Sequence, residues 1–124
     1  MADPLVSVVM PAYKAADTIA RAAASVLAQT YEAVELIVVS DDGEDYRGLL
    51  AEAHGLADPR IRQVSTDGVG TGDWNARNHG LAAAKGVFVT LVDADDAYAP
   101  DRLAALTPLA AADGAALDDT QIIL

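Results

Sequence analysis

The chain has 124 residues, of which 52% are hydrophobic and only 5% aromatic, and it carries a formal net charge of −11 at pH 7. This length fits a single domain over residues 1–124, with a core built mainly from alanine, valine, leucine and isoleucine. The acidic balance disfavours binding to nucleic acid or to an anionic membrane surface, and the lack of cysteine excludes disulfides and thiolate metal sites.

The N-terminal segment and the hydropathy pattern carry no sign of secretion or of a membrane span. Residues 1–4 lead straight into a short apolar run, without the basic and long apolar regions of a signal peptide. No apolar stretch approaches the roughly 20 residues that a membrane-spanning helix needs. We therefore expect a cytoplasmic protein, with any membrane association left to parts outside this chain.

Apolar runs of strand length alternate with segments of helical periodicity. The expected strands cover residues 5–10, 34–39, 61–64 and 87–92. Strands and helices in alternation predict βαβ units, and continuous apolar runs are typical of strands buried on both faces. The sequence therefore predicts an α/β, Rossmann-like fold with a mostly parallel sheet flanked by helices.

Four helices are expected between and after these strands. The first has an apolar face made of Ala15, Ile19, Ala22, Ala23, Val26 and Leu27, with Asp17 or Thr18 as N-cap. The second has apolar positions at Leu49, Leu50, Ala53 and Leu56 and ends near Gly55. The third has a face made of Trp74, Arg77, Leu81 and Ala84 and ends at Gly86 in a C′ role. The fourth begins at Pro100-Asp101 and continues through Pro108.

Residues 115–117 and 122–124 look like the opening of further structure. We therefore expect the fold to be incomplete at its C-terminus, and the chain to be the N-terminal portion of a longer protein.

Three carboxylates, those of Asp93, Asp95 and Asp96, follow the last apolar run. Like charges at a strand end repel and raise one another's pKa, and a divalent cation relieves that repulsion. Carboxylate oxygens are ligands that suit Mg²⁺ or Mn²⁺. The sequence therefore predicts a metal site here, with helix capping and solvated loop residues as the alternative.

A second acidic pair, Asp41 and Asp42, follows the run at 34–39. If both strands lie in one sheet, the two acidic ends face the crevice in which open α/β sheets bind ligands. A turn or capping role is the equal alternative for this pair, because Gly43 follows it directly.

The glycine-rich segment 68–72 lacks both a Walker lysine and the acidic partner of a dinucleotide-binding loop. We expect a flexible loop whose glycines allow the backbone to approach a phosphate. Arg77 and Asn78 follow it as either phosphate contacts or surface residues, and Tyr13 offers a stacking face to a base. His54 and His79 lie about one helix apart and show no metal-site spacing.

Five segments, in order, resemble the nucleotide-sugar-binding part of an inverting family 2 glycosyltransferase with the GT-A fold. They are residues 6–13 (VSVVMPAY), 25–31 (SVLAQTY), 35–43 (ELIVVSDDG), 72–86 (containing ARNHGL) and 91–96 (LVDADD). The last resembles the D-x-D metal motif of the family, and together the segments cover nearly the whole chain.

The resemblance implies a nucleotide-sugar site and a bound metal ion. Its implied donor-binding residues are Pro11, Ala12, Tyr13, Asp41, Asp42, Arg77, Asp93 and Ala94. Among these, Tyr13 would lie against the base and Asp41 would accept a hydrogen bond from it, which in the family favours uracil. Asp95 would hold Mn²⁺ or Mg²⁺ against the diphosphate, where the metal charge offsets the charge that builds on the leaving group.

The function implied by the resemblance is metal-assisted transfer of a sugar, with inversion, from a nucleoside-diphosphate sugar, UDP-linked, to an acceptor hydroxyl. The carboxylate that acts as catalytic base in this family would lie beyond Leu124, so we expect the chain alone to be inactive. Ser40 and Glu44-Asp45 depart from the residues usual around the acidic pair and leave the base specificity open.

Two other functions remain as alternatives. One is a non-catalytic module that binds a nucleotide or a nucleotide sugar. The other, weaker one is a phospho-accepting receiver domain, whose first strand should end in an acidic pair rather than in Met10-Pro11-Ala12. The sugar, the acceptor and the oligomeric state stay open, a homo-oligomer included.

Overall fold

A computed structural model of the chain describes residues 3–113, 116–117 and 122–123. Its main sheet has four parallel strands in the order β3-β2-β1-β4. They are β1 (Val6–Ala12), β2 (Val34–Ser40), β3 (Ile61–Ser65) and β4 (Phe88–Leu91). The predicted parallel α/β sheet is thus confirmed, although β1 runs two residues further than expected and β4 is shorter at both ends.

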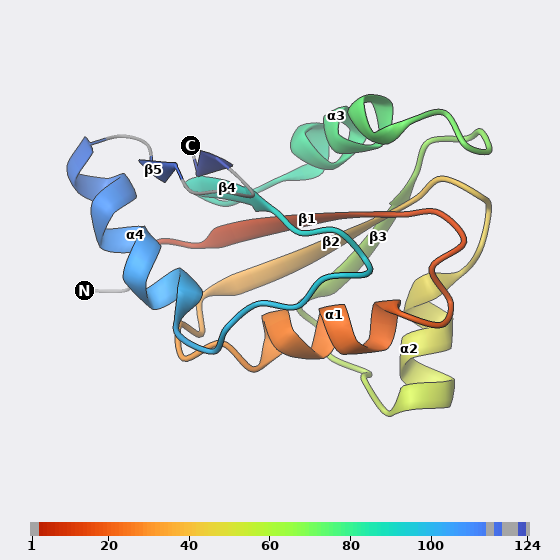
Figure 1. The fold of residues 1–124 in the computed structure, drawn as a ribbon, viewed down its shortest axis with the longest axis horizontal. Coiled ribbons are helices and arrows are strands. Elements are labelled where there is room, and N and C mark those ends of the chain that lie inside the picture. The colour runs from red at the N-terminus through yellow and green to blue at the C-terminus, as the bar shows by residue number, and fades with distance from the viewer. Residues whose placement is uncertain (1–2, 114–115, 118–121, 124) are drawn as a thin grey trace.

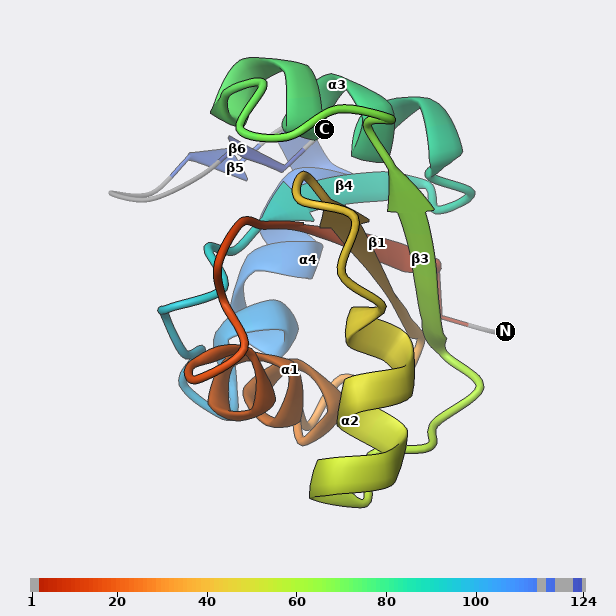
Figure 2. The ribbon, with the colours of Figure 1, turned by 90° about the vertical axis from the view of Figure 1, so that its right-hand side faces the viewer.

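The helices lie on both faces of this sheet. They are α1 (Ile19–Leu27), α2 (Tyr46–His54), α3 (Asp73–Ala83) and α4 (Arg102–Asp113). Figures 1 and 2 show α3 on one face, with α1, α2 and α4 on the other. Among the described residues, none of these helices has the length and apolar content needed to cross a bilayer.

Two short strands follow α4, at positions where the sequence predicts further structure. Strand β5 (Ala116–Leu117) pairs antiparallel with β6 (Ile122–Ile123), and β6 lies beside β4. The remaining residues of the two predicted segments, 115 and 124, lie outside the described part of the chain.

The ends of α1, α2 and α4 differ from the predicted residues at three points. Thr18 is the N-cap of α1, but its side chain makes no capping bond, and its hydroxyl donates instead to the Ala15 carbonyl at 3.4 Å. Helix α2 starts at a cap that sequence analysis missed, Asp45, whose carboxylate accepts from Gly48 N at 2.9 Å. It ends as predicted at Gly55, whose φ of 66° is left-handed. Helix α4 begins two residues after Pro100 and continues through Pro108.

The predicted face of α3 is wrong. Trp74 and Leu81 are 78% and 40% exposed, whereas Ala76 and Gly80 are the buried residues of the helix. The reason is close packing on the sheet: a Cβ at Gly80 would lie 2.2 Å from Cγ1 of Val9. A helix that approaches a sheet this closely can turn only its smallest residues toward it, whatever the hydrophobic periodicity suggests.

Gly86 does not end α3, because the C-cap is Ala84. Gly86 instead allows the chain to pass close to β1: a Cβ there would lie 2.7 Å from the carbonyl oxygen of Leu5. Its N–H donates to Ser7 Oγ at 2.8 Å, which fixes the entry into β4.

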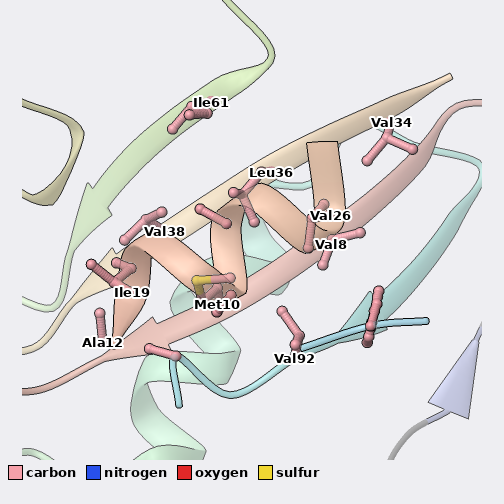
Figure 3. Close-up of a cluster of buried hydrophobic side chains, with 14 of the residues drawn as sticks. Val8, Met10, Ala12, Ile19, Val26, Val34, Leu36, Val38, Ile61 and Val92 are labelled. Carbon is pink, nitrogen blue, oxygen red and sulfur yellow. The ribbon is translucent and has the colours of Figure 1, made fainter. Parts of the chain in front are cut away.

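The two faces of the sheet bury two separate apolar clusters. On β1, Val6, Val8, Met10 and Ala12 point to the α1 and α2 side, and Val9 points to the α3 side. This follows from the alternation of side chains along a strand. Figure 3 shows the larger cluster, in which side chains of β1 and β2 pack against Ile19 and Val26 of α1. Burial on both faces agrees with the continuous apolar runs of the sequence.

A buried carboxylate links the sheet to the end of α3. Glu35 on β2 is 6% exposed, and it accepts hydrogen bonds from Ser7 Oγ at 2.5 Å and from Lys85 N at 2.7 Å. Arg62 Nη1 lies 2.6 Å from the same carboxylate and also donates to the Ala83 carbonyl, in the last turn of α3. Burial by itself would raise the pKa of Glu35, but these hydrogen bonds and the charge of Arg62 lower it.

We expect Gly80→Ala to lower the free energy of unfolding by about 1–3 kcal/mol, even though alanine is the better helix former. The added methyl group would overlap Val9 on a strand buried on both faces, so helix or strand must shift. Urea denaturation measures the change. Asn78→Ala, at an exposed position of the same helix, is the matched control and should cost nothing. Equal stability of the two variants would show that α3 has room to move away from the sheet.

We expect Glu35→Gln to lower stability by about 1–3 kcal/mol at pH 7, because it removes a buried charge that pairs with Arg62. Since the folded-state pKa of Glu35 is lowered, its contribution is complete above the unfolded-state pKa and disappears as the pH falls through the folded-state pKa. The difference between wild type and variant should therefore shrink below about pH 4.3. Urea melts from pH 7 to pH 3 test this, with the exposed Glu52→Gln as control. A difference that does not vary with pH would contradict the prediction.

Candidate functional site

The loops after β1, β2 and β4 enclose one cleft at the carboxyl edge of the sheet. Its volume is about 470 Å³. It is lined by Pro11, Ala12, Tyr13, Lys14, Ala15, Thr18, Asp41, Asp73, Ala76, Asp93, Ala94 and Asp95. The convergence follows from the strand order, because β1 lies between β2 and β4 and all three strands point the same way.

Seven of the nine predicted site residues line this cleft. They are Pro11, Ala12, Tyr13, Asp41, Asp93, Ala94 and Asp95. Arg77 and Asp42 are the two that the structure does not bring into it.

Asp41 is held rigidly at the floor of the cleft. Its side chain is 4% exposed, and Oδ1 accepts hydrogen bonds from Thr66 Oγ1 and Thr71 Oγ1, both at 2.7 Å. Oδ2 accepts from Gly72 N at 3.3 Å. Burial alone would raise the pKa of Asp41, but the hydrogen bonds from the two threonines and from the backbone lower it. Asp41 is therefore a fixed, ionised acceptor.

The glycine-rich segment 68–72 is tied to Asp41 as well. Gly70 N donates to the Asp41 carbonyl at 2.7 Å. Gly70 has a φ of 61°, and a Cβ there would lie 3.2 Å from Cε1 of Tyr13. The loop expected to be flexible thus has three contacts with Asp41 and lies against the Tyr13 ring.

Tyr13 and Lys14 form one wall of the cleft. Tyr13 is 46% exposed, and the Lys14 ammonium lies 5.3 Å from the centre of its ring. Among the described residues that line the cleft, Lys14 is the only cation. A partly exposed aromatic ring with a cation over it suits a planar ligand that also carries negative charge.

The acidic segment after β4 lies on the other side of the cleft. One carboxylate oxygen from each of Asp93, Asp95 and Asp96 lies within 4.8 Å of the others, and all three residues are exposed. Partial burial raises the pKa of Asp93, and although Arg77 opposes the shift, Asp96, Asp73 and Asp95 add to it. Hard oxygen ligands at this spacing, under mutual repulsion, fit a divalent cation such as Mg²⁺ or Mn²⁺.

Arg77 lies beside the cleft. Its Nη2 is 3.7 Å from Asp93 Oδ1, and the side chain lines a neighbouring hollow of about 240 Å³ with Asp96 and Tyr98. Its guanidinium also lies 5.9 Å from the ring centre of the exposed Trp74.

Asp42 does not line the cleft. Oδ2 accepts from Lys14 N at 2.7 Å and from Tyr46 Oη at 2.6 Å, and Oδ1 accepts from Glu44 N at 3.1 Å. Ser40, which departs from the family pattern, has its one hydroxyl proton within reach of the Glu44 carbonyl at 2.9 Å and of the same Oδ1 at 3.3 Å. This departure therefore serves the local structure of the acidic loop.

Sequence analysis missed several residues of the site. Lys14 and Asp73 line the cleft, and Thr66 and Thr71 fix Asp41. Lys14 directly follows the predicted Tyr13, so its position along the chain was a usable signal. No local pattern marks Thr66, because only the pairing of β2 with β3 brings it to Asp41.

Comparisons with known proteins show the family and the fold of this chain. The family model described as Glycosyl transferase family 2 matches residues 7–123. The chain is 40% identical over 122 residues to the succinoglycan biosynthesis protein ExoO of Rhizobium meliloti (strain 1021). The aligned region covers 97% of this chain and 34% of that protein. The chain thus spans about a third of the length of this curated relative.

Two solved structures share the fold. The S. aureus protein TarS (residues 1–349), in complex with UDP-GlcNAc, superposes with a TM-score of 0.76 at 23% identity, over 90% of this chain and 32% of that one. The Pyrobaculum calidifontis mannosyltransferase PcManGT, in complex with GDP-Man and Mn²⁺, gives a TM-score of 0.67 at 25% identity, over 83% and 30% of the two chains. The predicted GT-A type architecture is thereby confirmed.

We expect Thr66→Val to raise the pKa of Asp41, because it removes one of the hydrogen bonds that stabilise the carboxylate while preserving side-chain shape. Carboxyl ¹³C NMR titration measures that pKa directly. Thr30→Val, which makes the same change at an exposed position outside the cleft, is the control. An unchanged Asp41 pKa in Thr66→Val would show that the remaining donors suffice.

Proposed function

Because the chain belongs to glycosyltransferase family 2, we propose that its cleft binds a nucleoside-diphosphate sugar as the donor for transfer to an acceptor hydroxyl. The observation that carries the proposal is the meeting of an aromatic wall, a fixed ionised acceptor and a carboxylate cluster in one cleft. In a donor of this kind, the aromatic wall matches the face of the base, and the ionised acceptor matches an N–H on the edge of the base. The carboxylate cluster matches the diphosphate through a bound cation. Residues 1–124 act as a single donor-binding unit in this proposal.

The nucleobase lies against Tyr13, with Pro11 and Ala12 beneath it. Asp41 accepts a hydrogen bond from a ring N–H, because its pKa is lowered and it has no proton to donate. Uracil offers such an N–H, and TarS, which shares the fold, is solved with UDP-GlcNAc. Guanine offers one too, and PcManGT is solved with GDP-Man. We propose UDP as the nucleotide, with GDP as the direct comparison in the test.

The diphosphate lies toward Asp93, Ala94 and Asp95. A cluster of carboxylates repels a diphosphate unless a cation lies between them, and PcManGT is solved with Mn²⁺. Asp95, with Asp93 beside it, would hold Mn²⁺ or Mg²⁺, and the bound ion would supply positive charge against the leaving nucleoside diphosphate. Arg77 adds positive charge next to Asp93.

The transfer step that we propose is a direct displacement. The acceptor hydroxyl oxygen forms a bond to the anomeric carbon while the bond from that carbon to the diphosphate oxygen breaks, which inverts the configuration. A carboxylate takes the hydroxyl proton, and the nucleoside diphosphate leaves with the bonding electrons. We assign the base and the acceptor site to no residue of this chain.

Calorimetric titration of UDP, with and without Mn²⁺, tests the proposal. We expect binding that depends on Mn²⁺ and that Asp95→Asn weakens at least tenfold, about 1.4 kcal/mol. Asp101→Asn, which removes an exposed carboxylate outside the cleft, should bind like wild type. GDP in place of UDP measures the base preference.

Circular dichroism confirms that each variant is folded. Absence of UDP and GDP binding by folded wild type would contradict a donor site in this chain. Binding that ignores both Mn²⁺ and Asp95→Asn would contradict the metal assignment alone.

A further inference from the structure

The turn that follows β1 is held from outside the cleft by two residues of the β2–α2 region. Asp42 Oδ2 accepts the Lys14 N–H at 2.7 Å, and Tyr46 Oη accepts the Ala15 N–H at 3.1 Å. Tyr46 Oη in turn donates to the same Asp42 oxygen at 2.6 Å. We call this arrangement of Asp42 and Tyr46 around two successive backbone amides the amide clamp.

The clamp holds a backbone conformation that its residue does not favour. Lys14 has a φ of 50°, in the left-handed region that residues other than glycine and asparagine rarely adopt. A lysine stays there only where surrounding contacts fix the backbone. The amide clamp binds the N–H groups of Lys14 and of the next residue, Ala15.

This turn sets the position of the aromatic wall of the cleft. Tyr13 directly precedes Lys14, lines the cleft and is 46% exposed. The ring also lies close to Gly70, where a Cβ would be 3.2 Å from Cε1 of Tyr13, so a side chain at this position would crowd the ring. A change in the turn therefore moves the Tyr13 ring relative to Asp41.

The clamp joins a buried phenol to a half-buried carboxylate. Tyr46 is 1% exposed, and both Asp42 oxygens accept hydrogen bonds. Burial raises the pKa of Tyr46 to about 12, so the phenol keeps its proton. Burial opposes ionisation of Asp42, but the bonds from Tyr46, Lys14, Glu44 and Ser40 lower its pKa. The pair is thus a phenol donating to a carboxylate.

We infer that Asp42 and Tyr46 are positioning residues for the nucleotide: they fix the Tyr13–Ala15 turn, so that the Tyr13 ring meets the base that Asp41 recognises. The inference rests on the proposed function of the cleft as a nucleotide-sugar site. It gives Asp42 a role different from the ligand contact that the sequence predicts, and it gives a role to Tyr46, which no motif marks.

Tyr46→Phe is the direct test, because phenylalanine fills the same buried space and removes only the hydroxyl. UDP affinity in Mn²⁺ should fall about tenfold, by loss of a preorganised wall. The affinity for Mn²⁺ alone should not change, because the acidic cluster lies on the loop after β4. Tyr31→Phe is the matched control: it removes a hydroxyl that donates to the Pro4 carbonyl, outside the cleft, and should bind UDP like wild type.

Amide NMR separates positioning from a loss of overall stability. In Tyr46→Phe, the Lys14 and Ala15 amides should shift and exchange faster with solvent, while amides in the centre of β1 keep their protection. Asp42→Asn provides a second variant, because it weakens the acceptor that Lys14 N and Tyr46 Oη share while the tyrosine side chain is kept, and it should weaken UDP binding as well.

The outcomes are distinct. If wild type binds UDP and both variants bind it equally well, the positioning role is wrong and the proposed function stands. If wild type binds neither UDP nor GDP, the donor site and this inference fall together. If UDP and Mn²⁺ affinities fall in parallel, or β1 loses its protection, the clamp serves general stability and the inference is overturned.

Discussion

The structure depends on one constraint: β1 is hydrogen-bonded on both sides, to β2 and to β4, and is buried on both faces. Its backbone groups must all be paired, because unpaired amides in such a place are costly. The neighbouring strands β2 and β4 must therefore pair with β1 in a fixed register. On one face of the sheet, α3 lies so close to β1 that only a glycine, Gly80, fits above Val9. Since the three strands are parallel, the constraint that completes the core also brings three loops to one edge. The cleft therefore forms where the loops after β1, β2 and β4 meet.

Two carboxylates that meet in this cleft have opposite electrostatic environments. Asp41 is deeply buried, yet its pKa is lowered, because hydroxyl and amide donors surround it. Asp93 is more exposed, yet its pKa is raised by partial burial and by other acids. Donors of the protein itself stabilise the charge of Asp41, whereas the described residues leave the charge of Asp93 and its acidic neighbours largely uncompensated. A carboxylate kept ionised by surrounding donors suits acceptance of an N–H from a neutral base, whereas unrelieved negative charge suits a cation.

Sequence reasoning predicted what depends on patterns along the chain. The four strands, the parallel sheet and the convergence of Pro11, Asp41 and Asp95 all follow from apolar runs and from strand ends. It failed where contacts between elements far apart in the sequence determine which residues are buried. The face of α3 was wrong, because the space above Val9, rather than periodicity, selects Gly80. Gly86 was misread for the same reason, since its close approach to Leu5 is visible only once β4 lies beside β1.

The pair Asp41 and Asp42 shows the limit most clearly. The sequence presents two equal carboxylates at the end of one strand, and composition cannot tell them apart. In the fold their side chains leave on different sides: Asp41 reaches the loop after β3, and Asp42 reaches α2 and the turn after β1. Both residues lie in the bend after β2, where the hydrogen-bond partners that the fold supplies, rather than the alternation of a strand, give each carboxylate its place. A doubled acid at a strand end therefore need not mean two ligand contacts. One carboxylate can meet the ligand while the other holds the loop that meets it.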